Sequence, residues 1–431
     1  MKILLTGASG FIGNRLLHAL SDRGCDVVCV SRRRPKQLPA RATWTGLDFN
    51  HAAHTSHWAA AVRGIHVVVN AVGILRESPS QTFDTIHRAA PCALFEAAAR
   101  AGVRHIVQIS ALGADEMAQS RYHLSKKAAD DYLLSLGVRA SIVQPSLVYG
   151  PGGTSAAMFE TFASLPLIPV PGRGEQLVQP VHIDDLIPAV MALVLSEIGP
   201  TRRIPMVGPE PLTLRQFYAE LRASMGIQDR ARYLPVPMPV MQAMAWLGNR
   251  LPRALLDRET LAMLERGNIG DAGDITALLR RPPRSPREFV RAPERAGVAL
   301  QARLRWLLPV LRVSVALVWL VTGLISLGLY PVEASLDLLR RAGVPAALGP
   351  LFLYGAAGLD LALGALTLWP RRSRWLWAAQ AGLMALYTAV ITIKLPEFWL
   401  HPYGPLLKNI PMLALLWLLY EMEDSRWTTS S

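Results

Sequence analysis

The hydrophobic pattern of the chain changes character near residue 280. Before that point, short apolar runs rich in β-branched residues alternate with alanine- and leucine-rich segments that end at glycine. Such runs predict strands and the segments between them predict helices, which together favour a parallel, doubly wound α/β sheet of the Rossmann type. The runs are KILLTG (2–7), DVVCVS (26–31), HVVVNAVG (66–73), HIVQISALG (105–113) and ASIVQPS (140–146). From about residue 151 the alternation loosens and proline becomes frequent, so we expect a small second lobe at about 151–280.

Long apolar segments dominate the last third of the chain. Residues 306–330, 346–369 and 375–393 each approach or exceed the roughly 20 residues that a helix needs to cross a bilayer. Residues 406–422 form a shorter fourth candidate. Because soluble helices of this length usually keep a polar face, we predict an all-α bundle of about four transmembrane helices at 306–422. Four buried helices of a soluble bundle are the alternative.

Arginine and proline are concentrated between these two parts. Residues 281–305 are rich in both and show little apolar periodicity, which predicts a juxtamembrane linker after a domain at 1–280. Arginines in this linker and in PRRSRW (370–375) outnumber the basic residues of the opposite loops. The positive-inside rule then puts the N-terminal domain and the C-terminus, with its tail at 423–431, in the cytoplasm. We therefore expect a multi-pass protein of the inner or cell membrane.

The formal net charge of +13 indicates an anionic partner. Because the arginines cluster beside the first predicted span, we expect anionic lipid to bind at the linker. The chain shows no basic face interleaved with aromatic residues, so no nucleic-acid partner is expected. The three cysteines form no pattern with histidine at metal-ligand spacing, so no metal site is expected, and they fit a reduced cytoplasmic compartment.

The first 20 residues predict a dinucleotide site. KILLTGASGFIGNRLLHAL (2–20) has the order of a strand, a glycine turn and a helix. Glycines at 7, 10 and 13 allow a tight turn, close approach to a pyrophosphate and close packing of helix on strand, while the helix N-terminus supplies free N–H groups. The candidate cofactor residues here are Thr6, Gly7, Gly10, Phe11, Ile12 and Gly13.

The end of the second predicted strand bears on which dinucleotide binds. A carboxylate is usual there in sites that select NAD, but this chain has Ser31 followed by Arg32, Arg33 and Arg34. Arginine favours the 2′-phosphate of NADP(H), so NADP(H) is predicted to be preferred, with NAD(H) as the alternative. Asp48 follows a third short strand and is a candidate for the adenine amino group or, equally, a solvated turn residue.

Several motifs in order resemble the short-chain dehydrogenase/reductase superfamily, in particular its extended and atypical epimerase/dehydratase-like branches. They are TGASGFIG (6–13), NAVG (70–73), YHLSKKAAD (122–130), PSLVYGPGG (145–153) and VHIDDL (181–186). The likeness covers about residues 1–280 and is strongest to the atypical members that include a nucleotide-binding accessory subunit of respiratory complex I. The last third is similar to DoxX-like membrane domains, in LLPVLRVSVALVWLVTGL (307–324), GLDLALGALTL (358–368) and HPYGPLLKN (401–409).

This resemblance implies roles for several residues. Tyr122 would be the general acid/base, and Lys126 would lower the pKa of Tyr122 and bind the nicotinamide ribose. Asn70, Ala71, Val72, Gly73 and Pro145 would lie beside the nicotinamide. The superfamily's usual serine or threonine is expected where Ala111 stands, so Ser110, one residue earlier, is the candidate for that third catalytic role.

Polar residues within the predicted spans suggest further contacts. Arg312 and Asp360 are expected to pair across the first two spans, unless Arg312 reaches the cytoplasmic interface instead. Glu397 and His401, near Lys394, are a candidate site for a quinone head group.

Three functions agree with these patterns. The first is a membrane-anchored NAD(P)(H) oxidoreductase or epimerase-like enzyme that acts on a lipid-soluble, quinone-like or carbonyl substrate at the cytoplasmic membrane face. The second is a non-catalytic nucleotide-binding protein with a structural or redox-sensing role, which Ala111 favours. The third, a transporter with a regulatory nucleotide domain, agrees least because the predicted spans hold few polar residues.

Overall fold

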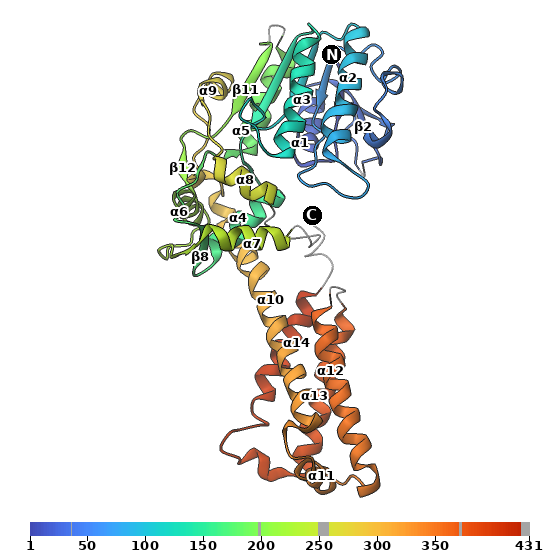
Figure 1. Ribbon diagram of the computed structural model, residues 1–431, viewed down its shortest axis with the longest axis vertical. Coiled ribbons are helices and arrows are strands. Elements are labelled where there is room, and N and C mark those ends of the chain that lie inside the picture. Colours follow the sequence, from blue (N-terminus) through green and yellow to red (C-terminus); the bar gives the residue numbers. More distant parts are fainter. Residues whose placement is uncertain (36, 197–199, 249–257, 370–372, 424–431) are drawn as a thin grey trace. The chain divides into compact units, whose positions relative to one another are not determined.

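The computed structural model describes residues 1–35, 37–196, 200–248, 258–369 and 373–423. The chain divides into two compact units, Met1–Ala302 and Arg303–Ser431 (Figure 1). Each unit is described by itself below.

A seven-stranded parallel sheet forms the centre of the first unit. Its strand order is β11-β6-β5-β4-β1-β2-β3, and every neighbouring pair is parallel. The strands are β1 (Lys2–Thr6), β2 (Asp26–Ser31), β3 (Ala42–Gly46), β4 (Val67–Asn70), β5 (His105–Ile109), β6 (Ala140–Pro145) and β11 (Arg202–Met206). The order reverses between β1 and β4, and in such sheets ligands bind at this point, beyond the carboxyl ends of the strands. The predicted doubly wound sheet is confirmed.

Helices cover both faces of the sheet (Figure 1). Ile3 and Leu5 of β1 belong to the core on one face, with α1 (Phe11–Asp22), α5 (Ile183–Leu195) and α9 (Gly273–Leu279). Leu4 points the other way, into a core formed with η3 (Asp84–Ala89), α2 (Ala90–Arg100) and α3 (Arg121–Ser135). This alternation follows from the two-residue period of a strand. Because helices cover both faces of the sheet, residues on both sides of each strand are buried, and the strands are almost continuously apolar.

The second lobe has its own core and small two-stranded sheets. Its elements are β7 (Val148–Tyr149), α4 (Thr154–Ser164), β8 (Ile168–Pro171), β9 (Leu177–Val178), β10 (Val181–His182), β12 (Leu212–Thr213), α6 (Leu214–Ser224), β13 (Tyr233–Val236), α7 (Met238–Gly248) and α8 (Arg258–Arg266). β7 pairs with β10, β9 with β12 and β8 with β13. Phe159 meets Phe217 edge to face in the core, with ring centroids 5.2 Å apart.

Residues 281–302, expected as most of a separate linker, belong to the first unit. This segment forms η4 (Pro286–Glu288), η5 (Ala292–Glu294) and the start of α10 (Arg295–Leu324), and it buries Phe289, Val290 and Ala302 in the core of the second lobe. Its arginines form ion pairs, namely Arg281–Asp185, Arg284–Asp184, Arg287–Glu220 and Arg291–Glu294. The first unit therefore extends to Ala302, beyond the expected domain end at residue 280, because composition does not reveal which apolar residues find a partner. Binding of anionic lipid here stays a prediction.

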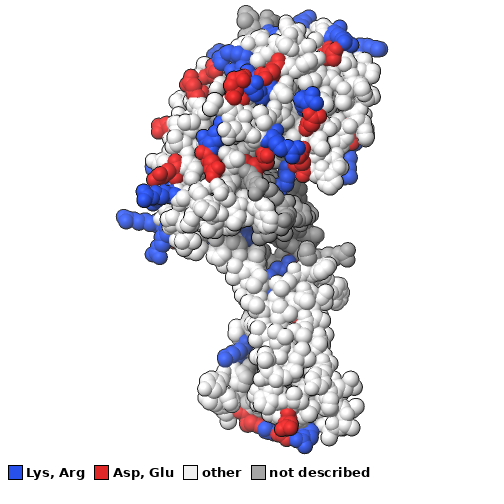
Figure 2. Space-filling model, in the orientation of Figure 1, with Lys and Arg blue, Asp and Glu red and all other residues white. Residues whose placement is uncertain are grey.

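The second unit is a bundle of apolar helices. After α10 come η6 (Ile325–Leu329), α11 (Val332–Arg341), η7 (Ala346–Leu348), α12 (Gly349–Leu368), α13 (Arg374–Lys394), η8 (Pro396–Trp399) and α14 (Asn409–Met422). By length and composition, Ala292–Leu329, Ala346–Leu368 and Arg374–Lys394 can cross a membrane. Few charged side chains lie along this unit in Figure 2. α14 is shorter, so the fourth crossing stays a prediction. Loop residues 370–372 and tail residues 424–431 lie outside the described residues.

Arg312 does not pair with Asp360, contrary to expectation. Its guanidinium lies 3.3 Å from a Glu423 carboxylate oxygen and over the Trp377 ring, and Trp377 Nε1 donates to the same carboxylate at 3.0 Å. Asp360 is buried, and within the described residues its Oδ1 atom has no hydrogen-bond partner. Glu397, a candidate together with His401 for a quinone head group, forms an exposed ion pair with Arg341, and the quinone site stays a prediction. In both ion pairs, the partner lies far away in the sequence, so the local sequence pattern does not reveal it.

Loss of the Glu423 carboxylate should destabilise the bundle. Glu423→Ala leaves the largely buried Arg312 without its counter-charge, so we expect a loss on the order of 2–5 kcal/mol in unfolding free energy. Glu421→Ala is the matched control, because Glu421, two residues before Glu423, forms an exposed pair with Arg374 of α13, and such pairs contribute about 0–1 kcal/mol. Thermal unfolding of the detergent-purified chain measures both variants. Equal, small shifts in Tm would contradict the importance of the Arg312–Glu423 pair.

Candidate functional site

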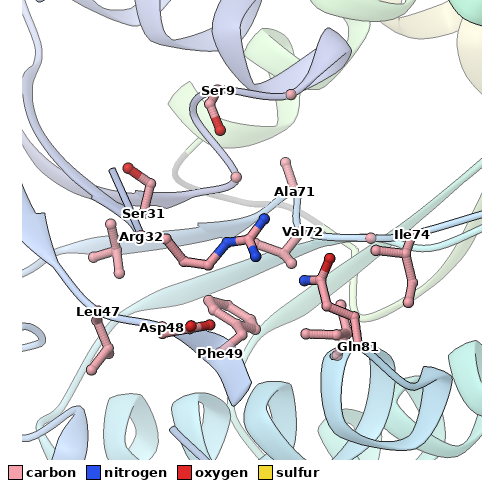
Figure 3. Close-up of a pocket in the computed structure, with 15 residues that line it drawn as sticks. Ser9, Ser31, Arg32, Leu47, Asp48, Phe49, Ala71, Val72, Ile74 and Gln81 are labelled. Atoms are coloured by element: carbon pink, nitrogen blue, oxygen red, sulfur yellow. The ribbon is translucent and has the colours of Figure 1, made fainter. Parts of the chain in front are cut away.

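A pocket opens at the carboxyl ends of β1, β2 and β4, where the strand order reverses. The glycine turn after β1, the Ser31–Arg32 end of β2, Asp48 and the segment Ala71–Gly73 after β4 line it (Figure 3). Eight of the 17 predicted cofactor residues therefore line one crevice, namely Gly7, Gly10, Ser31, Arg32, Asp48, Ala71, Val72 and Gly73.

In the glycine turn, neighbouring backbone segments approach so closely that only glycine fits. Gly7 has φ +71°, and a Cβ atom there would lie 2.6 Å from the carbonyl oxygen of Ala71. A Cβ on Gly13 would lie 2.1 Å from the carbonyl oxygen of Gly7. Such distances exclude a side chain at both positions. The turn therefore holds β1, the first turn of α1 and the end of β4 close together.

The N-terminus of α1 faces this turn. The cap residue Gly10 offers no side-chain acceptor, so the first N–H groups of α1, at Phe11 and Ile12, keep no capping side chain. Free N–H groups and the positive end of the helix dipole suit a pyrophosphate. The Phe11 ring lies against the loop at Gly150 and Gly153 and under the Arg15 guanidinium.

Thr6 and Asn70, two predicted cofactor residues, are fully buried between strands instead of lining the pocket. The Thr6 hydroxyl donates to Asn70 Oδ1, and the Asn70 amide donates to Gln108 Oε1 at 2.7 Å. This chain of hydrogen bonds ties β1 to β4 and β5. Pro145 likewise is a buried strand residue whose carbonyl accepts from Leu112 N–H at 2.9 Å.

At the β2 end of the pocket, Arg32 extends across the opening toward Val72 (Figure 3). The Ser31 hydroxyl accepts from Trp44 Nε1 at 3.1 Å and donates to the Arg33 carbonyl at 2.8 Å, which fixes the start of this arginine run. Arg33 is exposed and does not line the pocket. The Asp48 carboxylate accepts from Asn50 N–H at 3.0 Å, so it caps η1 (Phe49–His51) while it also lines the pocket.

Lys126 lies buried at the carboxyl ends of β4 and β5. Ser120 caps α3 and starts the helix that carries Lys126. The Lys126 ammonium group donates to the carbonyls of Val72, at 3.3 Å, and Ile109, at 3.2 Å. A Cβ on Gly73 would lie 3.2 Å from Nζ, so this charge lies directly beside the segment that lines the pocket. Burial lowers the pKa of Lys126, and the nearby Asp130 partly opposes this.

Tyr122 stands one helical turn before Lys126, in a small apolar cluster with Phe83 and Ala111. Its ring meets the rings of Phe83 and His87 edge to face, with centroids 5.8 and 5.3 Å apart. Burial, with a smaller contribution from Asp130, raises the pKa of Tyr122 to about 12. The resemblance implied that Lys126 lowers the pKa of Tyr122. Without a bound cofactor, burial of the phenol raises this pKa instead.

The third catalytic candidate, Ser110, is buried and donates a hydrogen bond to Asp130. Ala111 packs against Tyr122 in its place. Burial raises the pKa of Asp130, while the Ser110 hydrogen bond and Lys126 act in the opposite direction. Ser110 is thus engaged with a buried carboxyl group.

His87 is a site residue that sequence reasoning missed. Its Nε2 accepts from Ile74 N–H at 3.0 Å, so Nδ1 carries the proton and donates to the Ser125 hydroxyl at 2.9 Å. Ser125 in turn donates to the Tyr122 carbonyl at 2.7 Å. Burial and the Lys126 charge lower the pKa of His87 to about 2, so the ring stays neutral. His87 therefore joins the strand end after β4 to the helix that carries Tyr122 and Lys126.

No local sequence signal marks His87, because its partners lie 13 and 38 residues away. Gln81 and Ile86, from the segment after β4, also line the pocket and were missed for the same reason. The role of such a histidine can be recognised only in the folded structure, where residues that are distant in the sequence become its hydrogen-bond partners.

Comparison with known proteins gives two family matches. Residues 3–204 match the NAD dependent epimerase/dehydratase family, and residues 316–417 match the DoxX-like family. The two matches agree with the predicted resemblance to an epimerase/dehydratase domain followed by a DoxX-like domain, and the apolar helices indicate a membrane protein.

Curated relatives align with little more than half of this chain. A ceramide reductase of Caulobacter vibrioides is 26% identical over 240 residues, which cover 54% of this chain and 74% of the relative. NADH dehydrogenase (ubiquinone) 1 alpha subcomplex subunit 9 of Arabidopsis thaliana is 28% identical over 265 residues, or 57% of this chain and 64% of the relative. The alignment therefore spans less than two thirds of the second relative.

Solved structures agree on the fold. A nucleoside-diphosphate-sugar epimerase from Staphylococcus aureus superposes with a TM-score of 0.56 at 17% identity and covers 67% of this chain and 99% of that protein. A UDP-glucose 4-epimerase from Thermotoga maritima gives 0.51 at 19% identity, over 67% of this chain and 96% of its own. At this identity the likeness shows the fold alone.

Removal of the His87 ring should weaken cofactor binding. His87→Ala leaves Ile74 N–H without its acceptor, which corresponds to about 1–3 kcal/mol; if this cost falls on cofactor binding, the Kd for NADPH rises roughly 5- to 150-fold. His105→Ala is the control, because His105 is equally buried but bonds Ser141 on the neighbouring strand. Both variants should lose stability, and only His87→Ala should lose affinity. An unchanged Kd for His87→Ala would remove His87 from the site.

Proposed function

From an NAD dependent epimerase/dehydratase domain joined to a DoxX-like domain, we propose a membrane-anchored, NADP(H)-preferring reductase that acts on a carbonyl group of a lipid-soluble substrate at the cytoplasmic face. The observation that carries this proposal is the position of Lys126. Its buried ammonium group touches the strand end that lines the dinucleotide pocket, with Tyr122 one turn away on the same helix.

Each end of the pocket suits a different part of a dinucleotide. The N-terminus of α1 would bind the pyrophosphate, and Arg32, with Arg33, would bind a 2′-phosphate. Asp48 would accept from the adenine amino group, and the Lys126 ammonium group would donate to the nicotinamide ribose. Gly10, Arg32 and Asp48 line the pocket, and Lys126 contacts the carbonyl of Val72, which also lines it.

A reduction needs a hydride at the carbonyl carbon and a proton at its oxygen. A bound nicotinamide in its reduced form supplies the hydride. Tyr122 keeps its phenolic proton at neutral pH, since burial raises its pKa, and it would deliver that proton to the oxygen as the alcohol forms. Lys126, one helical turn away, would stabilise the phenolate that remains.

The proposed substrate class, a lipid-soluble carbonyl compound, is inferred from the apolar helices of the chain and from the names of two curated relatives. One curated relative is named a ceramide reductase, and another, from Streptomyces griseus, is named a (4-alkanoyl-5-oxo-2,5-dihydrofuran-3-yl)methyl phosphate reductase. A reductase fixed to the bilayer by apolar helices has direct access to a lipid-soluble compound. The arginine asymmetry of the loops supports the cytoplasmic face.

A second function is favoured by one specific observation. The Ser110 hydroxyl is engaged with Asp130, and Ala111 beside Tyr122 offers no hydroxyl to orient a carbonyl. The chain would then bind the nucleotide without turnover, in a structural or redox-sensing role. The similarity to a subunit of NADH dehydrogenase agrees with this alternative.

Cofactor preference provides the first test. NADPH should bind more tightly than NADH by one or two charge-assisted contacts, each worth roughly 1.5–3 kcal/mol. Arg32→Ala should remove most of this preference, and the double variant with Arg33→Ala should erase it. Arg34→Ala, an exposed arginine from the same run, is the control. Fluorescence titration of the purified chain measures each Kd, and equal affinities in the unmodified protein would contradict the proposal.

Lys126 and Tyr122 should differ in their effects. Lys126→Ala should weaken NADPH binding, whereas Tyr122→Phe should keep binding intact and abolish any substrate-dependent oxidation of NADPH. Activity that survives Tyr122→Phe would exclude the proton-transfer role. Absence of turnover in the unmodified chain, with binding intact, would support the second function.

The pH dependence adds an internal check on Lys126. The ammonium group is charged below its pKa, and burial lowers that pKa from the ordinary value of about 10.4. NADPH affinity should therefore fall as the pH rises, beginning below the range of an ordinary lysine. Lys127→Ala should keep this profile, while Lys126→Ala should lose it.

A further inference from the structure

Helix α7 of the second lobe turns an apolar face outward. Its outward residues are Pro239, Val240, Ala243, Met244 and Trp246, and its inward side includes the buried Ala245. Val240 is 48% exposed, Met244 55% and Trp246 44%. Gln242 is the one polar residue of the helix, and it lies at the edge of this face.

This pattern is the reverse of the neighbouring helix α6. There the buried positions include Phe217 and Leu221, while Arg215 and Gln216 face outward. An apolar helical face left in water is unfavourable by about 25 cal/mol per Å², and contiguous patches of this kind mark interaction sites. We therefore expect the outward face of α7 to be covered.

A bilayer is an apolar partner to which the second lobe is joined by a short stretch of chain. The first turns of α10 pack in the core of the same lobe through Val298, Ala299 and Ala302. α10 then continues without a break to Leu324, in the first candidate span. The apolar segment begins at Trp306, and at 1.5 Å per residue it starts only about 6 Å beyond Ala302. Along the chain, only a few residues therefore separate the core of the second lobe from the first apolar segment.

Length and charge also fit a bilayer surface. Eleven residues of helix measure about 16 Å, too short to cross the hydrocarbon core but sufficient to lie in the interface. Trp246 belongs to the residue type that is enriched at the level of the headgroups. Arg230 and Arg232 precede the helix and are exposed, so they can contact anionic headgroups.

We propose that α7 is a membrane-docking helix whose outward face inserts into the headgroup region of the bilayer that α10 enters. The proposal rests on the membrane spans and not on the reductase activity, so each can fail without the other. If both hold, docking brings the second lobe to the depth at which a lipid-soluble substrate is found.

Spin labels on the full chain test this docking. The chain is reconstituted in vesicles of phosphatidylethanolamine and phosphatidylglycerol, with a nitroxide at Met244→Cys or Val240→Cys and the labelled unmodified chain as background. The control is Gln216→Cys, on the exposed face of α6 in the same lobe. Collision rates with oxygen, which concentrates in the bilayer, are compared with those of a water-soluble nickel chelate.

The proposal predicts a ratio of oxygen to nickel collisions several-fold higher at positions 240 and 244 than at 216. A ratio equal to that of the control would overturn it, because the face would then lie in water. Low collision rates with both reagents, together with dipolar broadening, would overturn it in favour of contact with a second copy. Unchanged NADPH binding by the labelled variants verifies that the lobe has folded.

Discussion

The buried ammonium group of Lys126 is the constraint on which the site depends. A cation removed from water needs hydrogen-bond acceptors and a counter-charge, and it finds them in the Val72 and Ile109 carbonyls and in Asp130. The two carbonyls lie at the ends of the adjacent strands β4 and β5, so the charge holds α3 over these ends, one strand from the point between β4 and β1 at which the order of the sheet reverses. His87 stays neutral beside it and joins the same strand end to α3. The position of Tyr122 follows from this arrangement.

Sequence reasoning succeeded where the signal is local. The glycine turn, the β-branched runs and the i, i+4 spacing of Tyr122 and Lys126 each lie within one or two elements, so the doubly wound sheet and the pocket could be predicted. It failed where partners are distant. Nothing near Ser110 indicates that its hydroxyl binds Asp130, and nothing near Arg312 indicates Glu423, which lies 111 residues away. The extent of the first unit past residue 280 was not foreseen, because proline and arginine content conceals Phe289 and Val290, which are buried in the second lobe.

The membrane unit uses polar contacts sparingly, as expected of helices that pack in lipid. Trp319 Nε1 donates to Gln380 Oε1 at 2.8 Å, and the Gln380 amide donates to the Thr367 hydroxyl at 2.8 Å, so one buried network links α10, α13 and α12. Gly364 lets α12 approach α10, since a Cβ there would lie 2.6 Å from Leu320 Cγ. These contacts give the bundle a fixed internal structure, which agrees with a role as a rigid membrane anchor for the nucleotide-binding unit.

The central claim is that the pocket holds a dinucleotide with its nicotinamide end at Lys126 and Tyr122. A structure of the full chain with NADPH in lipid nanodiscs, determined by electron cryomicroscopy, tests this most directly. The account predicts the pyrophosphate at the N-terminus of α1, the 2′-phosphate beside Arg32, and the nicotinamide ribose within hydrogen-bond distance of the Lys126 ammonium group. A cofactor whose nicotinamide lies away from Lys126 and Tyr122, or an empty pocket at saturating NADPH, would contradict it.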